Sequence, residues 1–122
     1  MPVMAKLSLR IDFGPNEAIG PGKIELIERI ETVGSIAAAG RAMGMSYRHA
    51  WLLVDSVNQC FRHPVVTTKH GGRAGGGARL TPFGRELVRR YRAIERSAQR
   101  AANRHLDALQ GAKITRAGNR VS

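Results

Sequence analysis

The sequence has few of the features that mark exported, membrane-bound or disulfide-stabilised proteins. Cys60 is the only cysteine among 122 residues, which excludes an internal disulfide framework and a cysteine-rich zinc site. No run of about 18 apolar residues is present, and residues 1–10 contain no apolar stretch of signal-peptide length. We therefore expect a reduced, cytoplasmic protein that does not associate with membranes.

Acidic residues are also scarce, and the imbalance lies in one half of the chain. Asp and Glu total 9 against 20 Lys and Arg, which gives a net charge of +11. Residues 1–61 hold six bases and six acids, whereas residues 62–122 hold fourteen bases and three acids. This asymmetry favours a polyanionic partner, because each Lys or Arg that meets a phosphate releases condensed counterions. A merely solubilising surface is the alternative to nucleic acid, and an anionic membrane fits less well.

The chain is long enough for one small domain, and its first segment has the pattern of a strand. Residues 5–13 alternate between apolar and polar side chains, which is the period of a half-buried strand. The predicted apolar face consists of Leu7, Leu9, Ile11 and Phe13.

Three short helices are expected next, at residues 23–33, 36–43 and 47–61. Ser35 and Ser46 are suited to cap the second and third, because a serine hydroxyl accepts a hydrogen bond from the first helical turn. The second helix is rich in alanine and glycine, which allows close helix crossing. The predicted buried stripe of the first helix is Leu26, Ile27, Ile30 and Val33. That of the third is Ala50, Leu53, Val54, Val57 and Phe61.

The second half of the chain is predicted to form a hairpin and one long helix. Two strand-like segments within residues 65–81 bracket residues 71–77, of which five are glycine and which cannot form regular structure. Thr81 and Pro82 suit the cap and the first position of a helix over residues 82–109.

This order of elements predicts a mainly α fold with a small β wing (α+β), a winged helix-turn-helix with a long C-terminal dimerisation helix. The domain is expected over residues 1–110, with the helix-turn-helix at 23–61 and a basic disordered tail at 111–122. In such a fold the third helix enters the major groove of duplex DNA. The side chains expected to contact DNA are Ser46, Tyr47, Arg48, His49, Trp51, Lys69, Arg73 and Arg79.

These candidates differ in what they are expected to recognise. Arg48 can donate two hydrogen bonds to a guanine edge, worth about 1–3 kcal/mol of discrimination. Ser46 and Tyr47 suit a phosphate equally well. Arg73, at the tip of the hairpin, is expected to lie along the DNA backbone or minor groove. For Trp51, the groove and the protein core are equally good interpretations.

The last helix carries an apolar stripe with the spacing of a coiled-coil seam. The stripe consists of Leu87, Tyr91, Ile94, Ala98 and Ala101. It can pack against its own domain or against a second copy. We favour the dimer, which places two DNA-reading helices about 34 Å apart on a two-fold-symmetric site. A second stripe is basic and is interpreted as a solvated face: Arg85, Arg89, Arg92, Arg96, Arg100 and Arg104.

Catalytic and metal-binding patterns are weak. The glycine-rich loop is followed by Ala78-Arg79 rather than by the Gly-Lys-Ser/Thr of a phosphate-binding loop, so a nucleotide enzyme is disfavoured. Cys60 and His63 have the spacing of half a zinc site but lack a second pair. No Ser, His and Asp set is arranged as a triad. We expect no enzyme activity, no catalytic residues, no metal and no cofactor in this chain.

Three segments carry more specific motifs. They are Gly-Ser-Ile-Ala-Ala-Ala at 34–39, Gly-Met-Ser-Tyr-Arg-His-Ala-Trp at 44–51, and Gly-Gly-Arg-Ala-Gly-Gly-Gly-Ala-Arg-Leu-Thr-Pro-Phe-Gly at 71–84. Together they resemble the N-terminal DNA-binding domain of the ModE-type molybdate-dependent transcriptional regulators, which is itself similar to LysR-type winged helices. The resemblance covers roughly residues 5–105.

The resemblance implies a homodimeric transcriptional regulator at molybdenum-related promoters, which dimerises through the N-terminal strand region and the last helix. It also implies a response to molybdate. Family members bind molybdate in additional C-terminal domains that have no match here, so we expect a stand-alone DNA-binding form with no molybdate ligands.

The main hypothesis is therefore a sequence-specific, homodimeric regulator that binds double-stranded DNA at an inverted repeat. The alternative is a non-specific nucleoid-like or RNA-binding basic protein that uses charge alone. The two differ in whether affinity depends on the DNA sequence at physiological salt.

Overall fold

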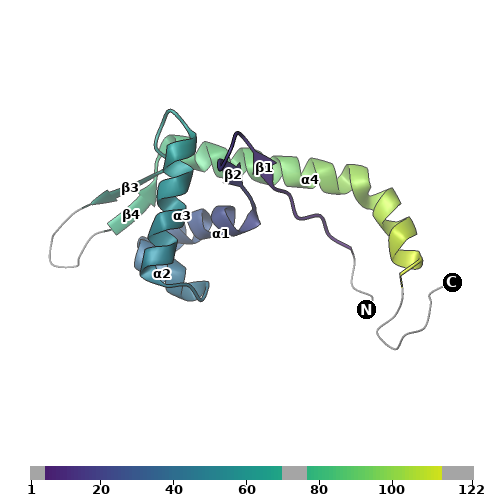
Figure 1. Ribbon diagram of the computed structural model, residues 1–122, viewed down its shortest axis with the longest axis horizontal. Helices are drawn as coiled ribbons and strands as arrows, with labels where there is room; N and C mark the ends of the chain where they lie inside the picture. The colour runs from purple at the N-terminus through teal and green to yellow at the C-terminus, as the bar shows by residue number, and fades with distance from the viewer. Residues whose placement is uncertain (1–4, 70–76, 114–122) are drawn as a thin grey trace. The chain divides into compact units, whose positions relative to one another are not determined.

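The computed structural model describes residues 5–69 and 77–113. Figure 1 shows helices and two small antiparallel sheets, and the predicted class, a mainly α, winged-helix-like α+β fold, is confirmed. Of the described residues, 9–91 form one compact unit, and 5–8 with 92–113 form a second. The elements in chain order are β1 (Ile11–Asp12), β2 (Ala18–Ile19), α1 (Pro21–Val33), α2 (Ile36–Ala42), α3 (Tyr47–Cys60), β3 (Val66–Lys69), β4 (Gly77–Leu80) and α4 (Pro82–Gly111).

Helix α1 lies at the centre of the first unit, with four side chains in the core. They are Ile24, Leu26, Ile27 and Ile30, each at most 1% exposed. Val33, predicted to be buried, is 48% exposed because it lies at the edge of this face, beside the glycine that ends the helix. That glycine, Gly34, adopts a φ of 74° and donates its N–H to the carbonyl of Ile30.

Helices α2 and α3 cross at close range, as the small residues of α2 predict. A Cβ atom at Gly40 would lie 2.8 Å from the Cβ of Ala50, so only glycine fits the crossing without a shift. Both predicted serine caps are present: Ser35 Oγ accepts from the N–H of Ala38, and Ser46 Oγ accepts from that of His49, each at 3.1 Å. The crossing of α2 and α3 thus rests on small-residue packing, and each helix begins at a serine cap.

Strands β3 and β4 form the wing, and two contacts attach it to the helices. Val66 pairs with Leu80 and Lys69 with Gly77, in antiparallel register. The side chain of Asn58, on α3, accepts from the backbone N–H of Val65 at 2.7 Å. The same carboxamide accepts from the N–H of Val66 and donates to its carbonyl, both at 3.1 Å. The predicted tip of the hairpin lies outside the described residues.

The start of α4 is the second attachment. Thr81 Oγ1 accepts from the N–H of Gly84 at 2.9 Å and donates to the carbonyl of Pro64 at 2.7 Å, so the predicted cap is present. Gly84 packs so closely on the wing that a Cβ there would lie 2.2 Å from the carbonyl oxygen of Val65. The residue just before β3 and the first turn of α4 are therefore in direct contact.

The predicted strand over residues 5–13 is mostly not a strand. Only Ile11 and Asp12 have ladder partners, because β2 offers just Ile19 and Ala18 to pair with. Residues 5–12 still alternate between partly buried and exposed side chains. Phe13 breaks the predicted face: it is 50% exposed, and its ring contacts the edge of Phe61.

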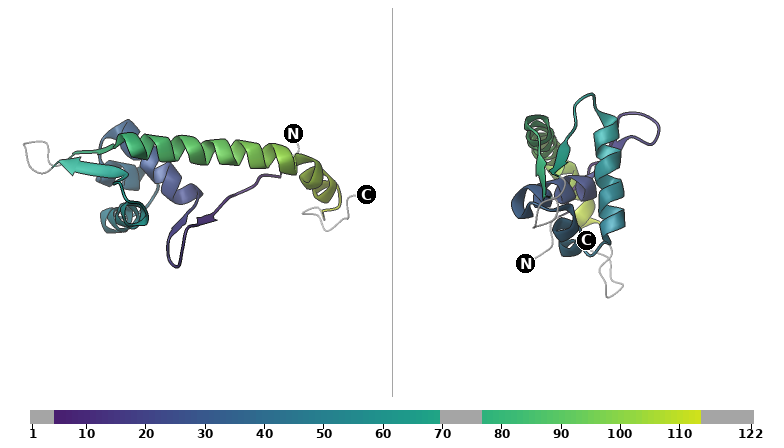
Figure 2. Two further views of the ribbon diagram at one scale, coloured as in Figure 1. Left: turned by 90° about the horizontal axis from the view of Figure 1, so that it is seen from above. Right: turned by 90° about the vertical axis from the view of Figure 1, so that its left-hand side faces the viewer.

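Helix α4 is continuous from Pro82 to Gly111, two residues beyond the predicted end (Figure 2). In the first unit, Tyr91 is 1% exposed, and its hydroxyl donates to the carbonyl of Leu9 at 2.6 Å. In the second unit, the side chain of Gln99 accepts from the backbone N–H of Leu7 at 3.0 Å. None of the helices within the described residues is long and apolar enough to cross a membrane.

Candidate nucleic-acid interface

The first turns of α3 present a cluster of exposed polar and aromatic side chains. Tyr47 is 58% exposed and Trp51 is 44% exposed, and Arg48 and His49 are also on the surface. The opposite side of the helix faces the core through Ala50, Val54 and Val57, as the spacing predicts. Four of the predicted DNA-contacting side chains thus share one exposed helix end, and Trp51 lies at the surface rather than in the core.

The exposed end of α3 carries positive charge that could meet an anionic ligand. Arg48 forms no ion pair with any acid in the described part of the chain, so its guanidinium keeps its donors for a ligand. Ser46 Oγ accepts the capping bond from the N–H of His49, which leaves its O–H able to donate to a phosphate. Unbonded backbone N–H groups at a helix start add a partial positive charge, which favours a phosphate there.

The wing places two further predicted residues on the surface. Lys69 ends β3, and Arg79 lies on β4 opposite Thr67; both side chains are exposed. The wing and the β1–β2 hairpin flank α3 on opposite sides (Figures 1 and 2). Arg73 lies outside the described residues, so its predicted contact stays a prediction.

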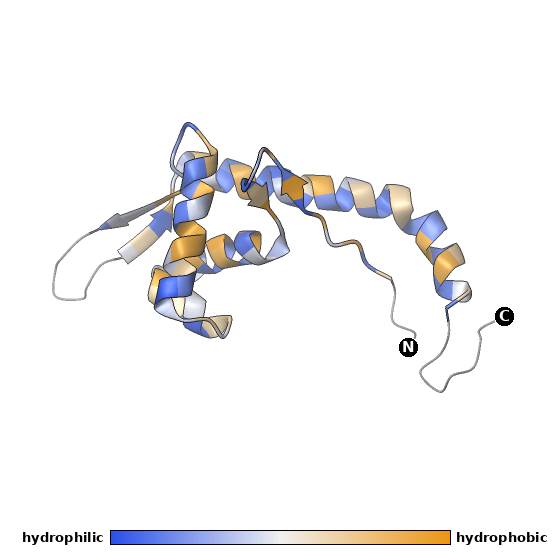
Figure 3. Ribbon diagram, in the orientation of Figure 1, coloured by the Kyte–Doolittle hydropathy of each residue, from blue (hydrophilic) through white to orange (hydrophobic). Residues whose placement is uncertain are grey.

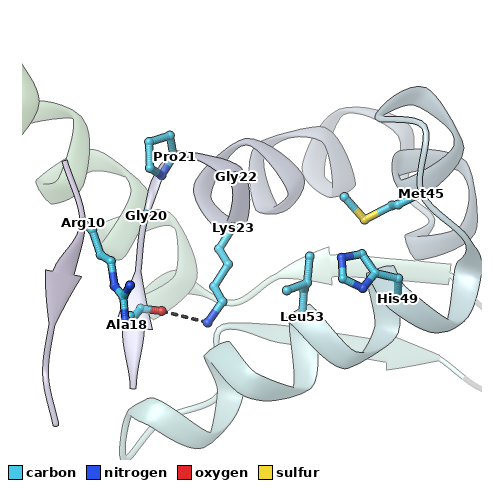
Figure 4. A pocket seen from close by; sticks show the side chains of 9 residues that line it. All are labelled: Arg10, Ala18, Gly20, Pro21, Gly22, Lys23, Met45, His49 and Leu53. Carbon is cyan, nitrogen blue, oxygen red and sulfur yellow. Dashed lines mark hydrogen bonds between the residues drawn. The ribbon is translucent and has the colours of Figure 1, made fainter. Parts of the chain in front are cut away.

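An open groove of about 540 Å³ lies between the β1–β2 hairpin, the start of α1 and α3. Figure 4 shows Lys23 on α1 facing His49 and Leu53 on α3 across the groove. Lys23 donates to the carbonyl of Ala18 at 2.8 Å, and Arg10, also in the lining, pairs with Asp12 at 3.0 Å. No acidic side chain is among the lining residues, but Arg10 is compensated by Asp12, so the positive charge that the groove adds beside His49 is that of Lys23.

Sequence reasoning did not associate Arg10 and Lys23 with His49. The three residues lie on separate elements, and no spacing along the chain brings them together. Asn58 was missed for a similar reason, because a single polar residue on a helix gives no sign that it bonds to a later strand.

The predicted dimerisation stripe divides into two parts. Tyr91 is in the core of its own chain, and Leu87 is partly buried against that core. Further along α4, Ile94 is 46% exposed, Ala98 is half-buried and Ala101 is exposed. The exposed part of this stripe therefore begins at Ile94.

Among the described residues, the pKa values of Cys60 and Glu86 are displaced from their usual range. Within the described residues, no three His, Cys, Asp or Glu side chains lie close enough together to hold a metal ion. Burial raises the pKa of the Cys60 thiol, which donates to the carbonyl of Ser56 at 3.3 Å. Hydrogen bonds from Arg89, and then from Arg90, lower the pKa of the Glu86 carboxyl group.

The fold and this exposed helix end define a winged-helix-like protein of the α+β class. Comparison with known proteins shows which proteins the sequence is similar to. The chain is 41% identical over 101 residues to the molybdenum transport protein ModE of Azotobacter vinelandii, which covers 83% of this chain. It is 36% identical over 99 residues, or 81% of its length, to the DNA-binding transcriptional dual regulator ModE of Escherichia coli K12.

The molybdenum-pterin-binding protein MopB of Rhodobacter capsulatus is 47% identical over 77 residues, which is 63% of this chain. The chain spans only 28% to 38% of the length of these three relatives. No protein family model matches it. None of the three relatives is named as an enzyme. The resemblance noted in the sequence thus extends to proteins of the ModE and Mop group.

Proposed function

We propose that this chain is a sequence-specific, homodimeric DNA-binding transcriptional regulator of molybdenum-related genes. The observation that carries the proposal is the exposed first half of α3, where Tyr47, Arg48 and Trp51 lie on one surface. A helix start with these residues matches the element that enters the major groove in helix-turn-helix proteins. Lys69 and Arg79 on the wing supply contacts to phosphates on the flank. The predicted contact of Arg73 falls outside the described residues.

The names of the relatives support molybdenum-related genes as the regulated genes. They do not identify the small molecule to which this chain would respond. One relative is named as a DNA-binding transcriptional regulator and another as a molybdenum transport protein. The chain covers little more than a third of either one. A selection of bound genomic DNA, with and without molybdate, tests the proposal. We expect an inverted repeat near molybdenum-related genes; affinity that is equal for all duplexes would favour the non-specific, charge-only alternative.

Replacing Arg48 with alanine is expected to reduce the preference for the selected sequence. Loss of a bidentate contact to guanine costs about 1–3 kcal/mol, or roughly 5- to 150-fold, at one base position. Titration of matched and singly mismatched duplexes by fluorescence anisotropy measures this loss. Arg62→Ala is the control, because Arg62 is exposed just beyond the other end of α3. An unchanged ratio of matched to mismatched affinity in Arg48→Ala would contradict a base-reading role.

Replacing Ile94 with glutamate is expected to convert the dimer to a monomer. The side chain is 46% exposed in the single chain, so the change leaves the fold intact, whereas a buried charge in a dimer seam is costly. Sedimentation equilibrium measures the state of association. Asn103→Glu adds the same charge at an exposed site on the opposite side of α4 and should remain dimeric. A monomeric wild-type chain at micromolar concentration would refute the homodimer.

A further inference from the structure

The arginine stripe of α4 is not electrostatically uniform. In its first part, Arg85 pairs with Glu31, and Arg92 pairs with Glu95 at 2.6 Å. Arg89, with its neighbour Arg90, pairs with Glu86. Four guanidinium groups therefore face three carboxylates of their own chain, and this part of the stripe keeps a net charge of only about +1 for a partner.

The second part of the stripe has no such compensation. Arg96, Arg100 and Arg104 are exposed and form no ion pair with any acid in the described part of the chain. Arg100 donates only to the hydroxyl of Ser97, at 3.3 Å. From residue 96 to the end of the described part, the only acid is Asp107, which is not in an ion pair either.

The spacing of these three arginines is unfavourable for an isolated helix. They follow one another at intervals of four residues, so neighbouring guanidinium groups lie on the same face and repel each other. A bound polyanion would relieve the repulsion and would release its own counterions.

The face they occupy is largely separate from the proposed dimer contact. Arg96 and Ile94 are two positions apart, which is about 200° around a helix. Figure 3 shows polar and apolar residues interleaved along α4, as a helix with two different faces requires. A dimer through Ile94, Ala98 and Ala101 would therefore leave Arg96 and Arg100 exposed. Arg104 would lie at the edge of that contact, about 60° around the helix from Ala101.

We propose that Arg96, Arg100 and Arg104 form a second, sequence-independent contact to the phosphate backbone of double-stranded DNA. The inference rests on the proposed function, because it takes duplex DNA as the partner. Three evenly spaced, uncompensated guanidinium groups fit a row of phosphates, to which arginine donates two hydrogen bonds at a time. This contact adds affinity without adding specificity.

The test compares two double variants that remove the same charge from different parts of α4. Arg100→Gln/Arg104→Gln removes uncompensated arginines, whereas Arg89→Gln/Arg90→Gln removes arginines that pair with Glu86. Binding to the selected operator and to an unrelated duplex is measured by anisotropy between 0.05 and 1 M salt, about the range in which counterion release is resolved. Circular dichroism verifies the helix content of each variant, and glutamine is a good helix former.

For Arg100→Gln/Arg104→Gln, we expect the slope of log K against log salt to fall in magnitude by up to about 1.8, or 0.9 per lost phosphate contact. At 0.1 M salt this corresponds to an affinity loss of up to about 60-fold, which vanishes near 1 M. The loss should be equal for operator and unrelated duplex. Arg89→Gln/Arg90→Gln should change the slope by less than half as much. Arg100→Lys/Arg104→Lys should retain most of the slope of the wild type.

Equal slopes for the two glutamine variants would overturn the inference, because the stripe would then act only through net charge. Tighter binding of the wild type to vesicles of anionic phospholipid than to duplex DNA, at the same salt, would overturn it as well. If the wild type binds the operator and Arg100→Gln/Arg104→Gln does so identically, this inference fails and the proposed function stands. If the wild type binds no duplex at 0.05 M salt, both fail.

Discussion

Replacing Gly84 with alanine is expected to lower the free energy of unfolding by about 3 kcal/mol, at the upper end of the usual range for overpacking. The new Cβ would lie 2.2 Å from the carbonyl oxygen of Val65 and 3.1 Å from its carbonyl carbon. These are backbone atoms of a segment held by Thr81 and Asn58, so no flexible side chain can move aside. Relief of the overlap requires the wing and α4 to separate.

Chemical denaturation followed by circular dichroism measures this loss. For a small domain, 1 kcal/mol corresponds to a change in Tm of about 4–8 °C, so a loss of about 3 kcal/mol should lower Tm by about 12–24 °C. Gly22→Ala is the matched control, because Gly22 is an exposed helical glycine with no atom within 4 Å of its missing Cβ. It should leave stability unchanged or slightly raised. If Gly84→Ala unfolds at the same denaturant concentration as Gly22→Ala, the close contact is not present in solution.

Replacing Asn58 with alanine is expected to cost about 2–4 kcal/mol of unfolding free energy. The carboxamide bonds to the N–H of Val65, the N–H of Val66 and the carbonyl of Val66, and both valines are at most 3% exposed. Alanine would leave these buried polar groups without their partner, at roughly 1–3 kcal/mol for each group that water cannot reach. The effect should be concentrated in the wing.

Hydrogen exchange resolves that effect by residue. Protection of the β3 and β4 amides should fall in Asn58→Ala, together with a lower denaturation midpoint. Gln59→Ala is the control, since it also removes a carboxamide, from the next position, but at an exposed site. Equal midpoints for the two variants would show that the side chain of Asn58 does not hold the wing to α3.

Local signals in the sequence predicted the elements well. The helix start at Ser46 needs only a hydroxyl three residues before an N–H, and the stop at Gly34 needs only a residue that tolerates a φ of 74°. The buried side of α3 follows from helical spacing alone, since Ala50, Val54 and Val57 recur at intervals of three and four. These features depend on residues within a few positions of each other.

Predictions that needed a partner element were less complete. The alternation of residues 5–13 predicted a half-buried strand. Residues 5–12 do alternate in burial, but only Ile11 and Asp12 find strand partners. Val33 and Phe13 have the right spacing for burial, yet nothing packs over them sufficiently, and each is about half exposed. Tyr91 has the spacing of a dimer seam, yet its own chain already buries it.

The sequence by itself determined where the helices begin and end, which side of each is apolar, and that the positive charge lies in the second half. Only the tertiary structure decided that Arg85 and Glu31 neutralise each other while Arg104 stays uncompensated, and that Gly84 and Asn58 hold the wing. The reason is physical: capping and periodicity arise between near neighbours on one element. Burial, ion pairing and close contact depend on which distant segment lies opposite.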